Sequence, residues 1–293
     1  MVCDAKFTKQ TVETGKVFIV TGANTGIGKE TALEIAKRGG TVYMACRDLN
    51  RSEEVRVEIE TLSRNSNVFV RELDLSSLDS IRHFAEGFKK EQDKLHVLIN
   101  NAGVMHTPKT LTKDGFELQL GVNHIGHFLL THLLLDVLKK SAPSRIVNLS
   151  SAAHLLGSIN IDDLNSEQSY SRIGAYNQSK LANVLFTREL ARRLGGTGVT
   201  VNAVHPGAVN TELARTWHPA VKIAMTPVMW AFKTPKSGAQ TSLYAALDPD
   251  LELVTGQYFS DCKPTDVASA AKDDKTSQFL WAESEKWTGI EVY

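Results

Sequence analysis

A tyrosine and a lysine stand four positions apart in the stretch YNQSK, residues 176–180. Residues at i and i+4 of an α-helix lie about 6 Å apart along its axis, so Lys180 can bring its charge near the phenol oxygen of Tyr176. That charge would lower the pKa of the phenol from about 10 and favour proton exchange near neutral pH. Alternatively, both side chains simply decorate a solvated helix face, and the rest of the chain must decide.

The composition is that of an ordinary globular domain. The chain has 293 residues, of which 42% are apolar, and no linker divides it. Lysine plus arginine (33) balance aspartate plus glutamate (33), so no overall field attracts nucleic acid. Cys3, Cys46 and Cys262 are far apart and odd in number. This spacing argues against a disulfide framework and a metal cluster and favours a reducing compartment.

The N-terminal stretch MVCDAKFTKQTVETGK lacks the apolar core of a secretory signal. Nowhere do eighteen uninterrupted apolar residues suggest a membrane span. We therefore expect an intracellular protein, either cytoplasmic or held peripherally on a membrane, because the absence of a span does not prevent a chain from lying on a bilayer.

Short apolar, β-branched runs alternate with longer helical patterns throughout the chain. The helical patterns cover residues 28–40, 80–92, 124–140 and 179–196, and the strand-like runs cover residues 16–22, 41–47, 68–74, 95–101, 145–151, 199–207 and 256–261. Such alternation predicts right-handed βαβ crossovers. We expect one α/β domain over residues 1–293, a Rossmann fold with a doubly wound parallel sheet of about seven strands and helices on both faces. Its ligand should bind beyond the carboxyl ends of the strands.

The first strand runs into TGANTGIG, where Gly22, Gly26 and Gly28 form a turn that opens a helix. Glycine lets the backbone approach a phosphate, and the helix N-terminus supplies free N–H donors and a partial positive charge. A glycine-rich turn alone is weak evidence, but its place between a strand and a helix predicts a dinucleotide site. The spacing differs from the usual dinucleotide fingerprint.

Three motifs together resemble the short-chain dehydrogenase/reductase family. They are TGANTGIG, NNAG at residues 100–103 and YNQSK, in the order and approximate spacing of the family's TGxxxGxG, NNAG and YxxxK motifs. The resemblance runs from about residue 16 to the C-terminus. It implies an enzyme that transfers hydride between a nicotinamide cofactor and a carbonyl or alcohol.

The end of the second strand, MACRD, bears on the choice of cofactor. NAD-preferring enzymes usually offer a carboxylate here, whereas a 2′-phosphate calls for arginine. By resemblance, Cys46 stands at the carboxylate position and Arg47 follows it, and arginine pairs with phosphate bidentately. We therefore expect NADP(H). Asp48 weakens this reading, although its side chain is equally suited to cap the next turn.

The resemblance implies further contacts to the cofactor. Asp74, in LDLSS, would lie near the adenine amino group, although it is nearly as well suited to cap the loop before the next helix. The small NNAG residues would lie against the ribose, and the loop HPGAVNTEL would pass the nicotinamide. The predicted cofactor-binding residues are Gly22, Asn24, Thr25, Gly26, Ile27, Gly28, Arg47, Asp74, Leu75, Asn101, Ala102, Gly103, Tyr176, Lys180, Pro206, Gly207, Val209 and Thr211.

By resemblance, the catalytic residues are Asn123, Ser151, Tyr176 and Lys180. Tyr176 would donate a proton to the developing alkoxide, and Ser151 would orient the carbonyl. Lys180 would lower the phenol pKa and bind the nicotinamide ribose, while Asn123 would hold a water linked to the lysine. Taken singly, a serine at a strand end is ordinarily a helix cap. The histidines show no repeated ligand spacing, and no metal is predicted.

Longer stretches, among them GVNHIGHFLLT and QSKLANVLFTREL, are similar to the NADP-preferring retinol dehydrogenases within this family. That similarity implies a small apolar carbonyl or alcohol substrate, a retinoid or lipid aldehyde. Two alternatives stay open: a reductase of other carbonyls such as steroids or quinones, and a non-catalytic dinucleotide-binding sensor. Homo-oligomers are common in the family.

Residues 212–238 hold more apolar side chains than a solvated connection needs. We expect this segment to act as a substrate lid, since methionine and tryptophan suit a pliant apolar pocket. Two other readings are a peripheral membrane contact, with the lysines at the headgroups, and a plain core helix.

Overall fold

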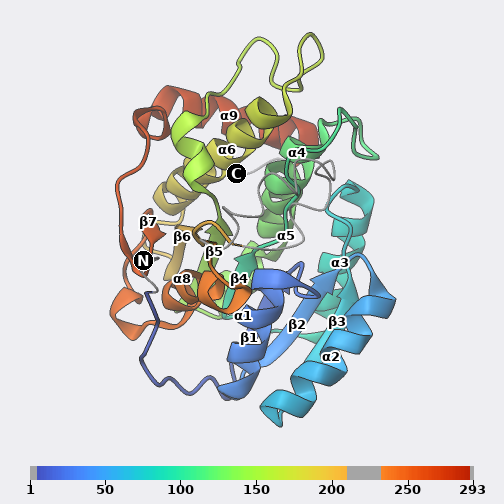
Figure 1. Cartoon of the computed structure of the whole chain (residues 1–293), viewed down its shortest axis with the longest axis vertical. Helices are drawn as coiled ribbons and strands as arrows, with labels where there is room; N and C mark the ends of the chain where they lie inside the picture. Colours follow the sequence, from blue (N-terminus) through green and yellow to red (C-terminus); the bar gives the residue numbers. More distant parts are fainter. Residues whose placement is uncertain (1–4, 210–231, 291–293) are drawn as a thin grey trace.

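A computed structural model describes residues 5–209 and 232–290. Within these residues one sheet has eight strands in the order β3-β2-β1-β4-β5-β6-β7-β8 (Figure 1). The strands are β1 (Val17–Thr21), β2 (Thr41–Cys46), β3 (Val68–Glu72), β4 (Val97–Asn100), β5 (Ser144–Leu149), β6 (Val199–His205), β7 (Tyr258–Ser260) and β8 (Lys263–Pro264). The seven strands expected from the sequence are all present.

The strands from β1 to β7 run parallel, because a crossover connection joins each of the strands β1 to β6 to the next strand along the chain. Every residue of β1 and β4 is buried, as a parallel sheet covered on both faces requires. The eighth strand, β8, was not predicted. It pairs antiparallel with β7 through the two-residue turn of Asp261 and Cys262, both in the left-handed region (φ +51° and +54°).

Helices cover both faces of the sheet. They are α1 (Gly26–Lys37), α2 (Leu49–Ser63), α3 (Leu78–Glu91), α4 (Leu118–Leu120), α5 (Gly126–Lys140), α6 (Arg172–Arg193), α8 (Pro235–Leu247) and α9 (Asp274–Thr288). Shorter helical turns are η1 (Gly121–Ile125), η2 (Ala152–Leu156), η4 (Pro249–Leu251) and η5 (Ser269–Lys272). None of the helices in the described ranges is long and apolar enough to cross a membrane.

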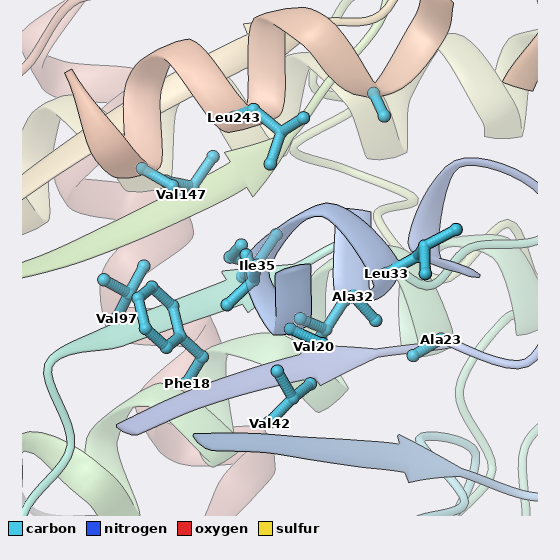
Figure 2. Packing of buried hydrophobic residues seen from close by; sticks show 14 of the residues in the cluster. Phe18, Val20, Ala23, Ala32, Leu33, Ile35, Val42, Val97, Val147 and Leu243 are labelled. Atoms are coloured by element: carbon cyan, nitrogen blue, oxygen red, sulfur yellow. The ribbon is translucent and has the colours of Figure 1, made fainter. Parts of the chain in front are cut away.

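Alternate residues of each strand belong to different cores, because side chains of a strand point to opposite faces. Phe18 and Val20 of β1 pack with α1 and α8, as Figure 2 shows for Ala32, Ile35 and Leu243. The intervening strand residues pack against α3, α5 and α6. Two apolar layers therefore hold the sheet rigid, and burying each large side chain contributes about 1.5–3 kcal/mol.

The C-terminal helix α9 lies beside α6 (Figure 1). Trp281 of α9 meets the ring of Phe128 edge-on, with centroids 5.2 Å apart, and the guanidinium of Arg193 lies 4.1 Å from the Trp281 ring. These contacts fix α6, the helix that carries Tyr176 and Lys180. The order of strands reverses between β1 and β4, and the predicted site residues follow the carboxyl ends of these strands and their neighbours.

Candidate active site

The glycine turn between β1 and α1 has the backbone that its sequence predicts. Gly22 and Gly26 have φ of +64° and +55°, which side chains rarely tolerate. A Cβ on Gly28 would stand 2.4 Å from the Gly22 carbonyl oxygen. Thr25 stands at the N-cap of α1, yet its side chain makes no capping hydrogen bond, and the first turn of the helix holds no acidic residue. The positive end of α1 therefore faces the turn and suits an anion.

The segment after β4 is tied to this turn through Thr21. Its hydroxyl oxygen accepts hydrogen bonds from the backbone N–H groups of Asn101 and Ala102, both at 2.9 Å. The Asn101 side chain donates to the Thr21 carbonyl at 2.7 Å and to the Gly22 carbonyl at 3.4 Å. Two walls of the predicted cofactor site are thereby joined. Thr21 was missed in the sequence, where its place at the end of the strand was the available signal.

Tyr176, Lys180 and Ser151 come together beyond the end of β5. The Ser151 side chain lies near the Tyr176 phenol and acts to lower its pKa, and the Ser151 hydroxyl oxygen accepts from the Ala153 N–H as the cap of η2. Lys180 Nζ lies 5.7 Å from the centre of the Tyr176 ring. Ser150 faces the other way and donates to the Lys180 carbonyl at 2.8 Å. The structure thus brings the phenol, the ammonium and a hydroxyl together.

The pKa values of this pair differ from the expectation drawn from the sequence. Burial raises the pKa of Tyr176 to about 12, against a lowering effect of the Ser151 hydrogen bond. Burial also lowers the pKa of Lys180 to about 8. Desolvation outweighs the attraction between the two groups because both lie almost wholly out of water. A lowered phenol pKa is therefore not a property of the protein alone.

Asn123 lies in η1, a wide helical turn that precedes α5. Its side chain accepts from the Val104 N–H at 2.8 Å and donates to the Val104 carbonyl and the Ser179 hydroxyl, both at 2.9 Å. Ser179 in turn donates to the Tyr176 carbonyl at 2.8 Å. Both N–H groups of the Asn123 amide are thus donated to protein atoms, so Asn123 connects the segment after β4 with the helix turn that carries Tyr176 and Lys180.

Two arginines stand at the carboxyl end of β2. Arg47 is exposed and immediately follows the strand, and Asp48 caps α2 by accepting from the Arg51 N–H at 3.1 Å. The Asp48 carboxylate therefore does serve as a cap. Arg51 lies near the glycine turn, where its guanidinium donates to the Thr25 hydroxyl at 3.3 Å. Arg51 was missed in the sequence, where its place in the first turn of the helix after β2 was the available signal.

The predicted adenine-lining residues have clear structural partners. The Asp74 carboxylate accepts from the Ser76 N–H and hydroxyl, at 3.0 and 2.6 Å, and lies 3.3 Å from Lys113 Nζ. The loop-capping role is therefore present. Leu75 is buried in the core beside Gly126, whose Cβ would stand 2.6 Å from the Leu75 carbonyl.

The loop after β6 runs close to the glycine turn. Gly207 has φ of +88°, and the aliphatic part of Lys233 packs over it. A Cβ on Gly238, in α8, would meet both Val209 at 2.6 Å and Ile27 at 3.1 Å. Pro206, Gly207 and Val209 thus lie on the expected side of the site. Thr211 and most of residues 212–238 fall outside the described ranges, so the lid and the membrane contact stay predictions.

The side chains present fit a nicotinamide dinucleotide. Gly22, Gly26 and Gly28 leave the backbone bare before an uncapped helix N-terminus. Gly103 lies against two of the predicted catalytic side chains, because a Cβ there would stand 3.1 Å from Asn123 Oδ1 and 3.6 Å from Lys180 Nζ. Small residues therefore line the predicted cofactor site from the glycine turn to the segment after β4, and the helix N-terminus beside them suits a phosphate.

Comparisons with known proteins agree with this site. A family model described as short chain dehydrogenase matches residues 16–222. Retinol dehydrogenase 12 of Homo sapiens is 57% identical over 277 residues, which cover 94% of this chain and 87% of the relative. A solved, uncharacterised protein from Mycobacterium paratuberculosis is 38% identical with a TM-score of 0.80, over 98% of this chain and 99% of that one.

A structure from Beutenbergia cavernae, described as a candidate NAD(P)-dependent gluconate 5-dehydrogenase with NADP bound at low occupancy, is 25% identical with a TM-score of 0.70. The alignment covers 86% of this chain and 97% of that one. The chain belongs to the short-chain dehydrogenase family. It is an oxidoreductase with a nicotinamide cofactor, and the family and fold expected from the sequence are confirmed.

Proposed function

We propose that the chain is an NADP(H)-dependent oxidoreductase that interconverts a retinoid aldehyde and its alcohol. The observation that carries this proposal is the buried Tyr176 phenol, with the Ser151 side chain near it and the buried ammonium of Lys180 5.7 Å from the centre of its ring. A protein that only sensed a dinucleotide would not need a tyrosine placed to donate a proton. The likeness to human retinol dehydrogenase 12 supports the substrate class.

In the reduction, the bound cofactor supplies hydride to the carbonyl carbon. Tyr176 donates its phenol proton to the substrate oxygen as negative charge develops there. Ser151 donates a second hydrogen bond to the same oxygen, so that the alkoxide forms in a site already polarised for it. In the oxidation the tyrosinate takes the hydroxyl proton back, and each proton step reverses.

Lys180 keeps a positive charge within reach of the tyrosinate once the proton has left. Its ammonium is anchored to the end of β5 and stands beside Gly103, where the nicotinamide ribose would lie. Because the site is buried, a charge there stabilises the tyrosinate more strongly than in water. This attraction acts in the opposite direction to the burial that raises the pKa of Tyr176.

The preference for NADP(H) over NAD(H) rests on Arg47 and Arg51. Arg47 is exposed at the carboxyl end of β2. Arg51, in the first turn of α2, donates to the Thr25 hydroxyl. Two guanidinium groups at this edge suit the 2′-phosphate, which accepts paired hydrogen bonds from arginine. The Asp48 carboxylate is held by its own helix and does not oppose them.

A panel of carbonyl substrates with NADPH and NADH tests this function. We expect all-trans-retinal to be reduced with a higher kcat/KM than a short aldehyde, a steroid ketone or a quinone, and NADPH to be preferred. A higher kcat/KM for the steroid or the quinone would replace the retinoid proposal with the broader carbonyl reductase. Binding of NADPH without turnover of any carbonyl would favour the sensor.

A further inference from the structure

His127 of α5 lies between the cofactor-facing wall and the catalytic helix, and none of the roles described above uses it. Its side chain is buried. Its Nε2 lies 2.9 Å from the Thr21 hydroxyl oxygen, and its Nδ1 lies 3.1 Å from the backbone carbonyl oxygen of Asn123. The imidazole therefore connects the end of β1 with the turn that carries Asn123.

The hydrogen-bond partners of Thr21 determine which ring nitrogen carries the proton. The Thr21 oxygen already accepts two N–H groups, from Asn101 and Ala102, and these occupy both of its lone pairs. Its own hydrogen must therefore be donated, and His127 Nε2 at 2.9 Å is a far better acceptor than the Ile99 carbonyl at 3.5 Å. Nε2 accepts, so Nδ1 bears the hydrogen and donates it to the Asn123 carbonyl.

The neutral form of the ring is consistent with its surroundings. Burial lowers the pKa of His127 to about 4, and the charge of Lys180 acts in the same direction. An imidazolium would also point an N–H at the Thr21 oxygen, which has no lone pair left. The Nδ1–H tautomer leaves every polar atom of this group satisfied.

These hydrogen bonds close a ring through the site. Thr21 holds Ala102, and two residues later Val104 donates to Asn123 Oδ1. The Asn123 carbonyl accepts from His127, which accepts from Thr21. Asn123 also reaches Ser179, one residue before Lys180. The ring of hydrogen bonds thus encloses Gly103, at which a Cβ would stand 3.1 Å from Asn123 Oδ1 and 3.6 Å from Lys180 Nζ.

We propose that His127 is a positioning residue for hydride transfer: by linking Thr21 to the Asn123 carbonyl, it fixes the cofactor-facing segment 101–104 at a set distance from the helix of Tyr176 and Lys180. Catalysis depends on the placement of the reacting groups to a fraction of an ångström. The kinetic part of this inference rests on the proposed function, whereas the hydrogen-bond ring and its effect on cofactor binding do not.

The chain supplies a matched control in His132, on the same helix. His132 Nδ1 lies 2.8 Å from the Phe128 carbonyl, four residues earlier, just as His127 Nδ1 meets Asn123. Its Nε2 has no hydrogen-bond partner among the described residues, and its ring packs on Phe128 and Trp281. His132→Phe removes a buried imidazole from α5 without touching the ring of hydrogen bonds.

The first experiment reads the tautomer directly. In protein labelled with ¹⁵N-histidine, the imidazole nitrogen shifts of His127 should show a protonated Nδ1 and a bare Nε2. Thr21→Val should abolish this single tautomer, and Thr21→Ser, which keeps the hydroxyl, should preserve it. A protonated Nε2 in the wild type would overturn the inference, and so would a tautomer unaffected by Thr21→Val.

The second experiment measures NADPH affinity by fluorescence titration and hydride transfer in a single turnover with retinal. We expect His127→Phe to slow hydride transfer by about tenfold or more and to weaken NADPH binding by several-fold. His132→Phe should change both by less than about twofold. Equal effects of the two variants would mean that His127 only supports the fold, and would overturn the inference.

A double variant separates positioning from general damage. In the Thr21→Val background the ring of hydrogen bonds is already broken. Adding His127→Phe should therefore slow hydride transfer by no more than about twofold further. Full additivity of the two losses would contradict the proposal. If the wild type reduces no carbonyl, the proposed function fails, and the tautomer and the NADPH affinities still decide whether His127 holds the cofactor wall.

Discussion

The ammonium group of Lys180 donates a hydrogen bond to the backbone carbonyl oxygen of Leu149, the last residue of β5, at 3.2 Å. The lysine is therefore hydrogen-bonded to the strand that precedes Ser151, and its Nζ lies 5.7 Å from the centre of the Tyr176 ring. Both residues are buried, which rules out the reading of YNQSK as a solvated helix face. Replacing this lysine by an apolar residue should therefore abolish activity and increase the free energy of unfolding.

Lys180→Met should stabilise the fold at pH 7 while removing activity. Burial lowers the pKa of Lys180 to about 8, from 10.5 for a free lysine, so the folded state binds the proton less tightly than the unfolded state does. The free-energy cost of burying the Lys180 ammonium is fully present below pH 8 and disappears as the pH rises to 10.5. We expect a gain in unfolding free energy of roughly 1–3 kcal/mol at pH 7.

Denaturant unfolding at a series of pH values checks this prediction. The difference in unfolding free energy between Lys180→Met and the wild type should shrink between pH 8 and 10.5, where the unfolded chain also loses its proton. A variant less stable than the wild type at pH 7 would show that the bond to Leu149 outweighs the cost of burying the charge.

Arg51→Ala should weaken NADPH binding and leave NADH binding nearly unchanged. A hydrogen-bonded charge pair is worth roughly 1.5–3 kcal/mol, or about 10–150-fold in affinity. Arg47→Ala should act in the same direction. Arg56→Ala is the control, because Arg56 lies on the same helix and is paired with Glu53 and Glu60. Titration of each variant with NADPH and NADH measures these affinities. Equal losses of affinity for NADPH and NADH would refute the assignment of the arginines to the 2′-phosphate.

Gly103→Ala should slow turnover and weaken cofactor binding, roughly tenfold each. The added methyl would stand 3.1 Å from Asn123 Oδ1 and 3.6 Å from Lys180 Nζ, in the space assigned to the ribose. Gly87→Ala, on α3, is the matched control, since no described atom lies within 4 Å of its Cβ position. Steady-state kinetics should show the loss for Gly103→Ala alone; wild-type behaviour of that variant would contradict the placement of the ribose.

Much of the fold was predictable because each parallel strand carries a strong local signal. β1 and β6 are apolar, β-branched runs that end in turn residues, and their bounds agree with the expected runs to within about two residues. β8 carries no such signal: Lys263 and Pro264 form a strand only because the turn at Asp261 and Cys262 returns the chain to β7. Its pairing is a consequence of tertiary structure.

The site was predictable as a set of residues but not as a set of contacts. Family motifs point to Tyr176, Lys180 and Ser151, which the structure brings together. The direction of the pKa shift at Tyr176 was wrong, because spacing along a helix reveals charge but not burial. His127 could not be found either, since it meets Thr21 only when β1 and α5 are packed together.

The most direct test of the account is a single-turnover reaction of Tyr176→Phe with NADPH and retinal. Phenylalanine keeps the buried ring and removes only the hydroxyl that is proposed to donate the proton. General acid groups typically contribute about 10²–10⁴-fold in rate, so hydride transfer should fall by at least 100-fold while the dissociation constant of NADPH changes by less than about threefold. A variant that kept more than about a tenth of the wild-type rate would contradict the assignment of Tyr176 as the proton donor.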